Sequence, residues 1–396
     1  MEPGVSHMPA TLVSRPPAMT TSVPAVTGPV TVEIKSDLHL KPDDAAAFET
    51  MLASRPQVGV FLSKAWLSGL FEDPPSGVEP ALMLLRAGHV LRGAAPIAVR
   101  RGRTHVHVGL LGGGAGSDRV DLLAARGFET ACADALLSWV ADSFGSRGYT
   151  IEFRDVPADS PLWGALHRAN AERTPPLAFQ PRDVHVLPYT DLADVRGWSL
   201  KSLDKHRRWL ERRGRLRLEL VHDPAGALAA YEALATFLHV RWRGHAEGST
   251  LDRPRTDRFH RHALPLLLRD GHLRMIRMSS DMRTVAVFYG LALGQWWGYY
   301  LAGYDREWAG RIHLGRINLA NAIDMAVRDG AAEFDFLKGV ERVKYLWPVR
   351  ERSALDADVY SANWAAQLNR AAHAARDTAA GFVKSARGLF STIAPR

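Results

Sequence analysis

The sequence predicts an α/β protein made of two tandem units, each with a mixed central sheet flanked by helices. Apolar periodicity alternates between strand-like and helix-like in the same order in each half: a strand, two helices, three strands, a helix, a strand, a short helix and a strand. One recurrence over so long a period indicates a duplicated domain rather than an array of short repeats. A chain of 396 residues with 46% hydrophobic residues is long enough to bury two cores.

The predicted domain boundaries follow this repeat, and the two units meet near residues 190–200. We expect a disordered leader over 1–30, an N-terminal unit over 31–190, a C-terminal unit over 191–362 and an alanine-rich helical tail over 363–396. The leader has no compact apolar segment after a basic start, and no stretch reaches the roughly 20 apolar residues of a membrane span. We therefore expect a cytoplasmic protein without a transmembrane segment, for which peripheral membrane contact stays open.

In the first half, alternating apolar residues predict strands and helical spacing predicts helices. Ser160 before Pro161 is typical of a helix start, and Gly148 of a helix end. The prolines within 173–188 favour a connecting segment there. The predicted strands cover 31–36, 81–86, 95–101, 105–111 and 149–153, and the predicted helices cover 42–54, 61–71, 127–145 and 160–171.

In the second half, the same patterns predict a matching set of elements, with Gly330 ending the fourth helix. The predicted strands cover 215–221, 273–278, 285–293, 296–304, 333–337 and 355–360, and the predicted helices cover 199–213, 224–243, 257–269, 314–328 and 340–346.

Charge points to an anionic partner or to a solvated surface. The net charge is +8, and residues 201–217 carry eight basic side chains against two acids. On a helix this stripe could contact a phosphate, an anionic membrane or RNA, or could simply face solvent. The single cysteine, Cys132, excludes a disulfide framework and a thiolate-rich metal site, and the histidine spacing leads us to predict no metal.

The most specific motifs lie in the second half. The segment YYLAGYD (Tyr299–Asp305) precedes the fourth helix, and EFDFLKG (Glu333–Gly339) and KYLW (Lys344–Trp347) follow it. With the element order, these motifs resemble the CelD/BcsL-like GNAT acetyltransferases, a family associated with cellulose and other exopolysaccharide biosynthesis. The pattern is also similar to the wider group of tandem GNAT proteins that includes the FemABX peptidyltransferases.

The resemblance implies acyl transfer from a thioester, acetyl-CoA or another acyl-CoA, to an amine or a sugar hydroxyl. In this fold two middle strands diverge and expose backbone N–H groups to the thioester, and the next helix turns its N-terminus to the pyrophosphate. Here that helix starts near His313. The cofactor-binding residues implied are Arg311, Gly315, Arg316 and Tyr300. The glycine is displaced by one position from the family pattern, and Ile317 replaces a second small residue.

Two residues are catalytic candidates beside these motifs. Asp335 alternates with two phenylalanines in a strand and could act as a general base, or could be a structural acid bonded to the backbone or to Lys338. The resemblance implies that Tyr345 protonates the departing thiolate, and the alternative is an aromatic side chain packed beside Trp347.

Polar residues gather where the long helix over 224–243 opens into a loop, a typical acceptor position. His245 could act as a base and Glu247 could orient an acceptor, while helix C-cap chemistry explains Gly244 without any function. The substrate-binding candidates are Arg241, Trp242, Tyr304 and Lys338.

These observations predict an acyl-CoA-dependent acyltransferase of polysaccharide or envelope assembly, with possible membership of a polysaccharide synthase complex. One alternative is a FemABX-like transferase that uses aminoacyl-tRNA and the basic segment over 201–217; otherwise we expect no nucleic-acid partner. The other alternative is a non-catalytic subunit of a synthase complex.

Overall fold

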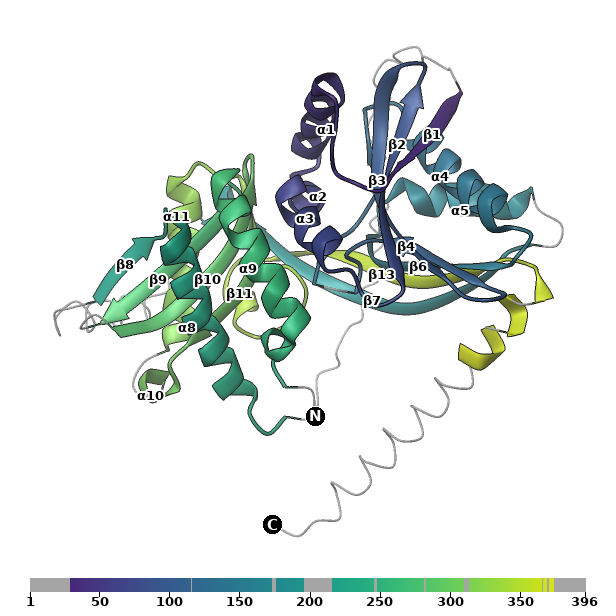
Figure 1. The fold of residues 1–396 in the computed structure, drawn as a ribbon. Coiled ribbons are helices and arrows are strands. Elements are labelled where there is room, and N and C mark those ends of the chain that lie inside the picture. The colour runs from purple at the N-terminus through teal and green to yellow at the C-terminus, as the bar shows by residue number, and fades with distance from the viewer. Residues whose placement is uncertain are drawn as a thin grey trace, which may run out of the picture.

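The computed structural model describes most of the chain between residue 29 and residue 373 (Figure 1). The described residues are 29–114, 116–172, 176–195, 216–245, 248–280, 283–309, 313–364, 366–368 and 370–373. The predicted leader, the predicted helix over 199–213 and most of the predicted tail lie outside them. No helix among the described residues is long and apolar enough to cross a membrane.

The described strands form one thirteen-stranded mixed sheet. Along the sheet the order is β1-β2-β3-β4-β6-β13-β7-β12-β11-β10-β9-β8, with β5 beside β3. The strands of the first half are β1 (Val30–Lys35), β2 (Val78–Ala87), β3 (Val90–Arg101), β4 (Val106–Leu110), β5 (Leu123–Ala124), β6 (Tyr149–Pro157) and β7 (Ala178–Asp191). The strands of the second half are β8 (Leu216–Leu220), β9 (Leu273–Ser280), β10 (Arg283–Leu293), β11 (Trp296–Tyr304), β12 (Glu333–Asp335) and β13 (Arg350–Tyr360).

The pairing shows an internal repeat. In the first half β1 to β4 pair antiparallel in sequence order, and β4 then pairs parallel with β6. In the second half β8 to β11 pair antiparallel in sequence order, and β11 then pairs parallel with β12. The predicted fold class, two tandem α/β units with mixed sheets, is confirmed.

The strands β7 and β13 form a long antiparallel ribbon that joins the two units, which lie side by side in Figure 1. The end of β7 pairs with β12 of the second half, whereas β13 pairs with β6 of the first half. The prediction of a connection over 173–188 is therefore wrong from Ala178 onward. The carbonyl of Pro188 accepts from Phe336 on the β12 side, so its missing N–H faces away from the β13 ladder.

The helices agree with the predicted order except in two places. The predicted helix over 61–71 is two helices that break at Ser63, whose hydroxyl caps the second by accepting from the Trp66 N–H at 3.3 Å. The predicted helix over 340–346 is only a 3₁₀ turn at Lys344–Leu346. The described helices are α1 (Pro42–Ser54), α2 (Pro56–Leu62), α3 (Lys64–Glu72), α4 (Glu129–Phe144), α5 (Pro161–Ala171), α6 (Leu192–Val195), α8 (Pro224–Trp242), α9 (Pro254–Arg269), α10 (Arg306–Ala309) and α11 (Leu314–Arg328).

A shared hydrophobic core fixes the two units against each other. The helices α2 and α3 of the first half pack into the core that α8, α9 and β11 form in the second half. Trp66 is fully buried at the centre of this contact, edge-on to Phe259 at 4.9 Å and to Tyr300 at 5.3 Å between ring centroids. Burial of an aromatic side chain of this size stabilises the contact by several kcal/mol, so it holds α3 of the first unit against α9 and β11 of the second.

Candidate functional site

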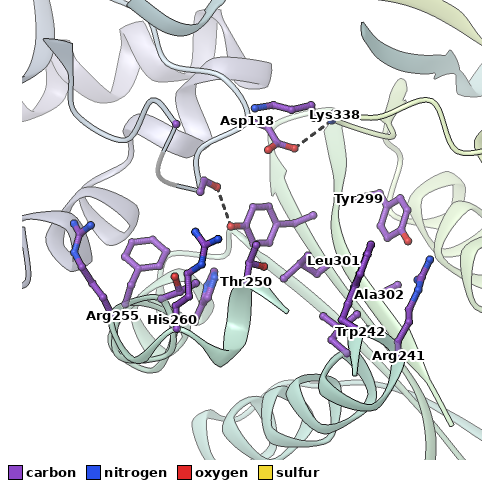
Figure 2. Close-up of a pocket in the computed structure, with 18 of the residues that line it drawn as sticks. Asp118, Arg241, Trp242, Thr250, Arg255, His260, Tyr299, Leu301, Ala302 and Lys338 are labelled. Atoms are coloured by element: carbon purple, nitrogen blue, oxygen red, sulfur yellow. Dashed lines mark hydrogen bonds between the residues drawn. The ribbon is translucent and has the colours of Figure 1, made fainter. Parts of the chain in front are cut away.

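A cleft of about 570 Å³ lies between the two units (Figure 2). The first half contributes the end of α3 and the loop after β4, and the second half contributes the end of α8, the start of α9, β11 and the segment after β12. The cleft does not lie near residues 190–200, where the two units meet in sequence. It lies where α3 and the loop after β4 reach across to β11.

The strand β11 has a free edge at this cleft. Its parallel pairing with β12 covers only Trp296, Trp297 and Gly298, because β12 is three residues long and ends at Asp335, opposite Gly298. Beyond Gly298 the edge of β11 has no strand partner among the described residues, and Tyr299 to Ala302 line the cleft. A bulge interrupts the pairing with β10 here, because Tyr300 has no partner between the Tyr289–Leu301 and Gly290–Tyr299 pairs. The backbone N–H groups that point away from β10 can bind a ligand.

Aromatic rings form one wall of the cleft. Tyr300 on β11 donates its hydroxyl hydrogen to the carbonyl of Gly116 at 2.8 Å, which ties the strand to the loop after β4. His260 on α9 is buried against Trp66 and Tyr300, and its Nδ1 lies 3.4 Å from the Tyr289 hydroxyl. Burial lowers the pKa of His260 to about 3, so its imidazole is neutral at pH 7.

Acid should destabilise the protein through its buried neutral histidines. Burial lowers the pKa of His105 to about 4 and that of His260 to about 3, while an unfolded histidine titrates near 6.5. Between the folded and the unfolded pKa of each histidine, the unfolded chain therefore binds more protons than the folded chain. The contribution of each neutral histidine to the free energy of unfolding is present above about pH 6.5 and is lost as the pH falls toward 4. Between pH 7 and pH 5 we expect the protonation of each histidine in the unfolded chain to lower the free energy of unfolding by about 2 kcal/mol. Denaturant unfolding at both pH values measures this, and an unchanged pH slope in His105→Gln would contradict it.

Asp118 is the carboxylate that the sequence analysis missed. It lines the cleft after the glycine-rich loop, and the backbone N–H of Lys338 donates to its Oδ2 at 3.2 Å. Loss of solvation raises the pKa of Asp118, and the charge of Lys338 opposes this rise. The glycine-rich loop is the sequence feature that could have pointed to Asp118. Gly112, Gly114 and Gly116 have positive φ and shape the turn that presents Asp118 to the cleft.

Lys338 joins the two halves at the floor of the cleft. Its ammonium contacts the Asp155 carboxylate, whose other oxygen accepts from the Gly114 N–H at 2.9 Å. Asp155 has a φ of 56°, an uncommon conformation for a residue other than glycine. The predicted substrate-binding position Lys338 therefore lies in the cleft, although its charge is paired.

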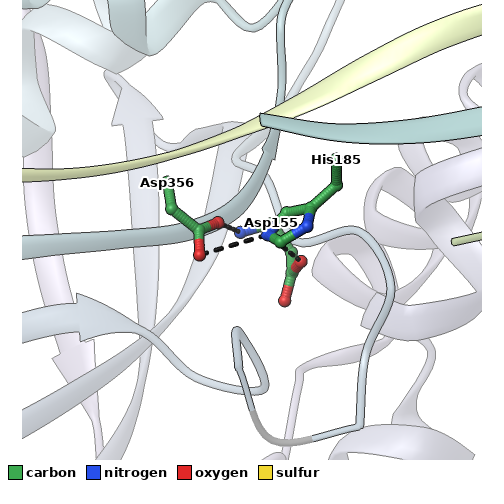
Figure 3. Close-up of side chains that lie close together, drawn as sticks. All are labelled: Asp155, His185 and Asp356. Atoms are coloured by element: carbon green, nitrogen blue, oxygen red, sulfur yellow. Dashed lines mark hydrogen bonds and ion pairs between the residues drawn. The ribbon is translucent and has the colours of Figure 1, made fainter. Parts of the chain in front are cut away.

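Three strands bring possible metal ligands together beside this pair. One ligand atom from each of Asp155, His185 and Asp356 lies within 4.8 Å of the others (Figure 3). His185 Nε2 is 3.2 Å from Asp356 and 3.6 Å from Asp155, and the Asp155 N–H donates to Asp356 at 2.7 Å. These donors suit a divalent cation chemically, but the ammonium of Lys338 already neutralises Asp155.

Asp335 does not line the cleft. Its side chain is fully buried, its Oδ2 lies 2.6 Å from Arg119 Nη2, and its Oδ1 accepts from the Leu337 N–H at 2.8 Å. The contact with Arg119 is a charge pair rather than an aligned hydrogen bond, since neither terminal nitrogen of Arg119 meets hydrogen-bond geometry with a described residue. This arrangement favours the structural interpretation of Asp335, with Arg119 as partner instead of Lys338.

The remaining predicted site residues are dispersed. Arg241 and Trp242 line the cleft, whereas His245 is exposed beside Trp242 and outside it. Tyr345 is also exposed; a hydrogen bond to Glu351 at 2.6 Å raises its pKa to about 12. Glu247 and Arg311 lie outside the described residues.

At the start of α11, the predicted coenzyme residues do not line the cleft either. A Cβ added to Gly315 would stand 2.9 Å from the ring of Tyr304, so this glycine makes room for a packed aromatic side chain. Arg316 is exposed on the first turn of the helix.

The class of the protein follows from this geometry and one match. The parallel pairing of β11 with β12 ends beside an interdomain cleft, which agrees with the fold implied by the motifs. Residues 199–345 match the family model described as "Acetyltransferase (GNAT) domain". This match shows a GNAT acetyltransferase domain over residues 199–345 and supports an acyltransferase.

Solved structures show the same fold over most of the chain. The structure titled "Crystal structure of FemX" is 10% identical, with a TM-score of 0.57 and coverage of 83% of this chain and 96% of that chain. "The structure of L-PGS from Bacillus licheniformis" is 12% identical, with a TM-score of 0.50 and coverage of 82% of this chain and 92% of that chain. No curated protein matches the chain significantly.

Proposed function

We propose that the protein transfers an acetyl or other acyl group from acyl-CoA to an amine or hydroxyl of a sugar acceptor, in cellulose, exopolysaccharide or envelope assembly. The free edge of β11 beside Asp118 is the observation that carries this proposal, because it puts hydrogen-bond donors and a candidate base in one cleft. The envelope assignment rests on the motif resemblance alone.

The donor thioester is proposed to lie along β11 from Tyr299 to Ala302. Free backbone N–H groups there would hold the carbonyl oxygen and stabilise its negative charge as the acceptor attacks. The coenzyme phosphates would then extend toward the N-terminus of α11, where unpaired N–H groups and the helix dipole favour anions.

Asp118 is proposed as the general base. As the acceptor nitrogen or oxygen bonds to the thioester carbon, Asp118 takes its proton, and the thiolate then leaves as the carbonyl re-forms. The raised pKa of Asp118 suits this role, since a base of ordinary aspartate pKa holds a proton too weakly. The aromatic side chains of Trp242, Phe259 and Tyr300 also line the cleft, and they would pack against the apolar face of a sugar ring.

Arg316 tests the donor site. We expect Arg316→Ala to weaken acetyl-CoA binding by about 1–3 kcal/mol, because a charge-assisted bond to phosphate is lost. Arg328→Ala, at the other end of α11, is the matched control and should bind normally. Thermal shift across a series of acyl-CoA thioesters measures this, since a ligand of the folded state raises the melting temperature. Equal shifts in wild type and Arg316→Ala would place the donor phosphates elsewhere.

A second candidate donor is aminoacyl-tRNA. Two observations favour it. The fold is similar to that of FemX over most of the chain. At the start of α11, Gly315 packs on Tyr304 and Ile317 is fully buried, which leaves no space for pyrophosphate there. Comparing acyl-CoA and charged tRNA in one filter-binding assay separates the two donors. Binding of tRNA without acyl-CoA would replace the first proposal.

A further inference from the structure

Arg255 lies where two cavities meet. It lines the cleft and also a second cavity of about 200 Å³ in the first unit, which opens beside the ends of β4 and β6. Its Nε donates to the backbone carbonyl of Asp73 at 2.6 Å, which fixes the guanidinium in place. The Asp73 carboxylate accepts instead from Arg258, at 2.7 and 3.0 Å. Among the residues that the structure describes, Arg255 therefore has no carboxylate partner.

The position of Arg255 is costly for a cation. It occupies the first turn of α9, where the helix dipole disfavours positive charge. Burial lowers the pKa of Arg255, Asp73 opposes this effect and Arg258 adds repulsion to it. A guanidinium nevertheless stays protonated in proteins, so the charge remains unneutralised. Arg255 is half-buried and forms no ion pair with a described residue, and a ligand anion would supply that partner.

The neighbouring wall carries more positive charge. Arg241 at the end of α8 and Arg253 before α9 line the same cleft, and neither forms an ion pair with a described residue. Figure 2 shows Arg255 and Arg241 toward opposite ends of this helical wall. The carboxylate of Glu341, also in the cleft, is already paired with Lys344 at 2.8 Å. An anionic ligand would thus meet more positive than negative charge along this wall.

We propose that Arg255 is a specificity-determining residue that binds a carboxylate or phosphate group of the acceptor, so that the acceptor is an acidic sugar. The assignment of this ligand as acceptor rests on the proposed function. The proposed function puts the donor phosphates at the start of α11, and this helix contributes no residue to either cavity. Arg241, Arg253 and Arg255 are therefore left to bind the acceptor. The second cavity has room for the part of an extended acceptor that lies beyond Arg255.

Binding of small sugars without any donor tests this proposal. Titration calorimetry at constant ionic strength would compare glucuronate and glucose 1-phosphate with uncharged glucose. At least one charged sugar should bind wild type more tightly than glucose, and Arg255→Gln should lose about tenfold or more of that affinity. Arg258→Gln is the matched control: it shares Asp73, is exposed and lines neither cavity, and we expect a change below about twofold.

Preference for glucuronate would identify a uronate acceptor, and preference for glucose 1-phosphate a phosphorylated one; both support the proposal. Equal affinity for all three sugars, or equal losses in the two variants, would overturn it. Unfolding midpoints of both variants show whether a loss of affinity reflects a damaged fold. The binding assay contains no donor, so its result does not depend on acyl-CoA. Charge-selective binding in a protein without acyl-CoA turnover would refute the proposed function and keep Arg255 as an anion-binding residue, without its assignment to the acceptor.

Discussion

Asp118→Asn should lower turnover by about 10²–10⁴ while the protein stays folded, which is the usual contribution of a general base. The amide keeps the volume of the side chain and an oxygen that can accept from the Lys338 N–H, so the loop after β4 should hold its position. Because its pKa is raised, the wild-type carboxylate loses its proton above the ordinary aspartate range. Wild-type turnover should therefore rise with pH through that raised pKa, and the variant should lack this rise.

The matched control for Asp118→Asn is Glu341→Gln. Glu341 lines the same cleft, but its carboxylate is paired with Lys344 and more than half exposed. We expect this variant to change turnover by less than about tenfold, since exposed pairs contribute little. Steady-state rates of both variants across pH, beside their unfolding midpoints, separate loss of a base from general loss of negative charge. An active Asp118→Asn with the wild-type pH profile would remove Asp118 from the mechanism.

Asp335→Asn should instead be a stability variant and cost about 3–5 kcal/mol in the free energy of unfolding. The buried Arg119 loses the only ion-pair partner it has among the described residues, and an unpaired guanidinium in the core is expensive. The pair also connects the loop after β4 with the end of β12, so its loss should loosen the contact between the two halves. Activity per folded molecule should stay near that of wild type, because Asp335 does not line the cleft.

The double variant Arg119→Met, Asp335→Leu is the control for that prediction. Removing both partners leaves no unpaired charge in this pair, so it should recover part of the stability that Asp335→Asn loses, although the Leu337 N–H loses its acceptor. Denaturant unfolding and turnover measured on one preparation decide between the two roles of Asp335. A stable but inactive Asp335→Asn would restore the general-base interpretation that the sequence left open.

The repeat of elements could be predicted because strands and helices depend on residues a few positions apart. The alternation in β9, β10 and β11 and the helical spacing in α8 and α11 are local patterns, and the structure has these elements close to the predicted bounds. The segment that became β7 was mispredicted for a tertiary reason. Its prolines are tolerated only where their missing N–H groups face away from the neighbouring strand, which depends on partners more than a hundred residues away.

The sequence by itself indicated an acyltransferase, because the motifs YYLAGYD and EFDFLKG lie within residues 199–345, which match a GNAT acetyltransferase domain. In the structure YYLAGYD covers the end of β11, and EFDFLKG begins with β12, the strand paired with β11. Only the tertiary structure decided which carboxylate faces that cleft. Asp118 and the Lys338 N–H are 220 residues apart in sequence, and Asp335 is paired by Arg119 from the other half. Burial and charge partners set the chemistry of a carboxylate, and folding brings both from distant parts of the chain, so local pattern could not distinguish a buried structural acid from a candidate base.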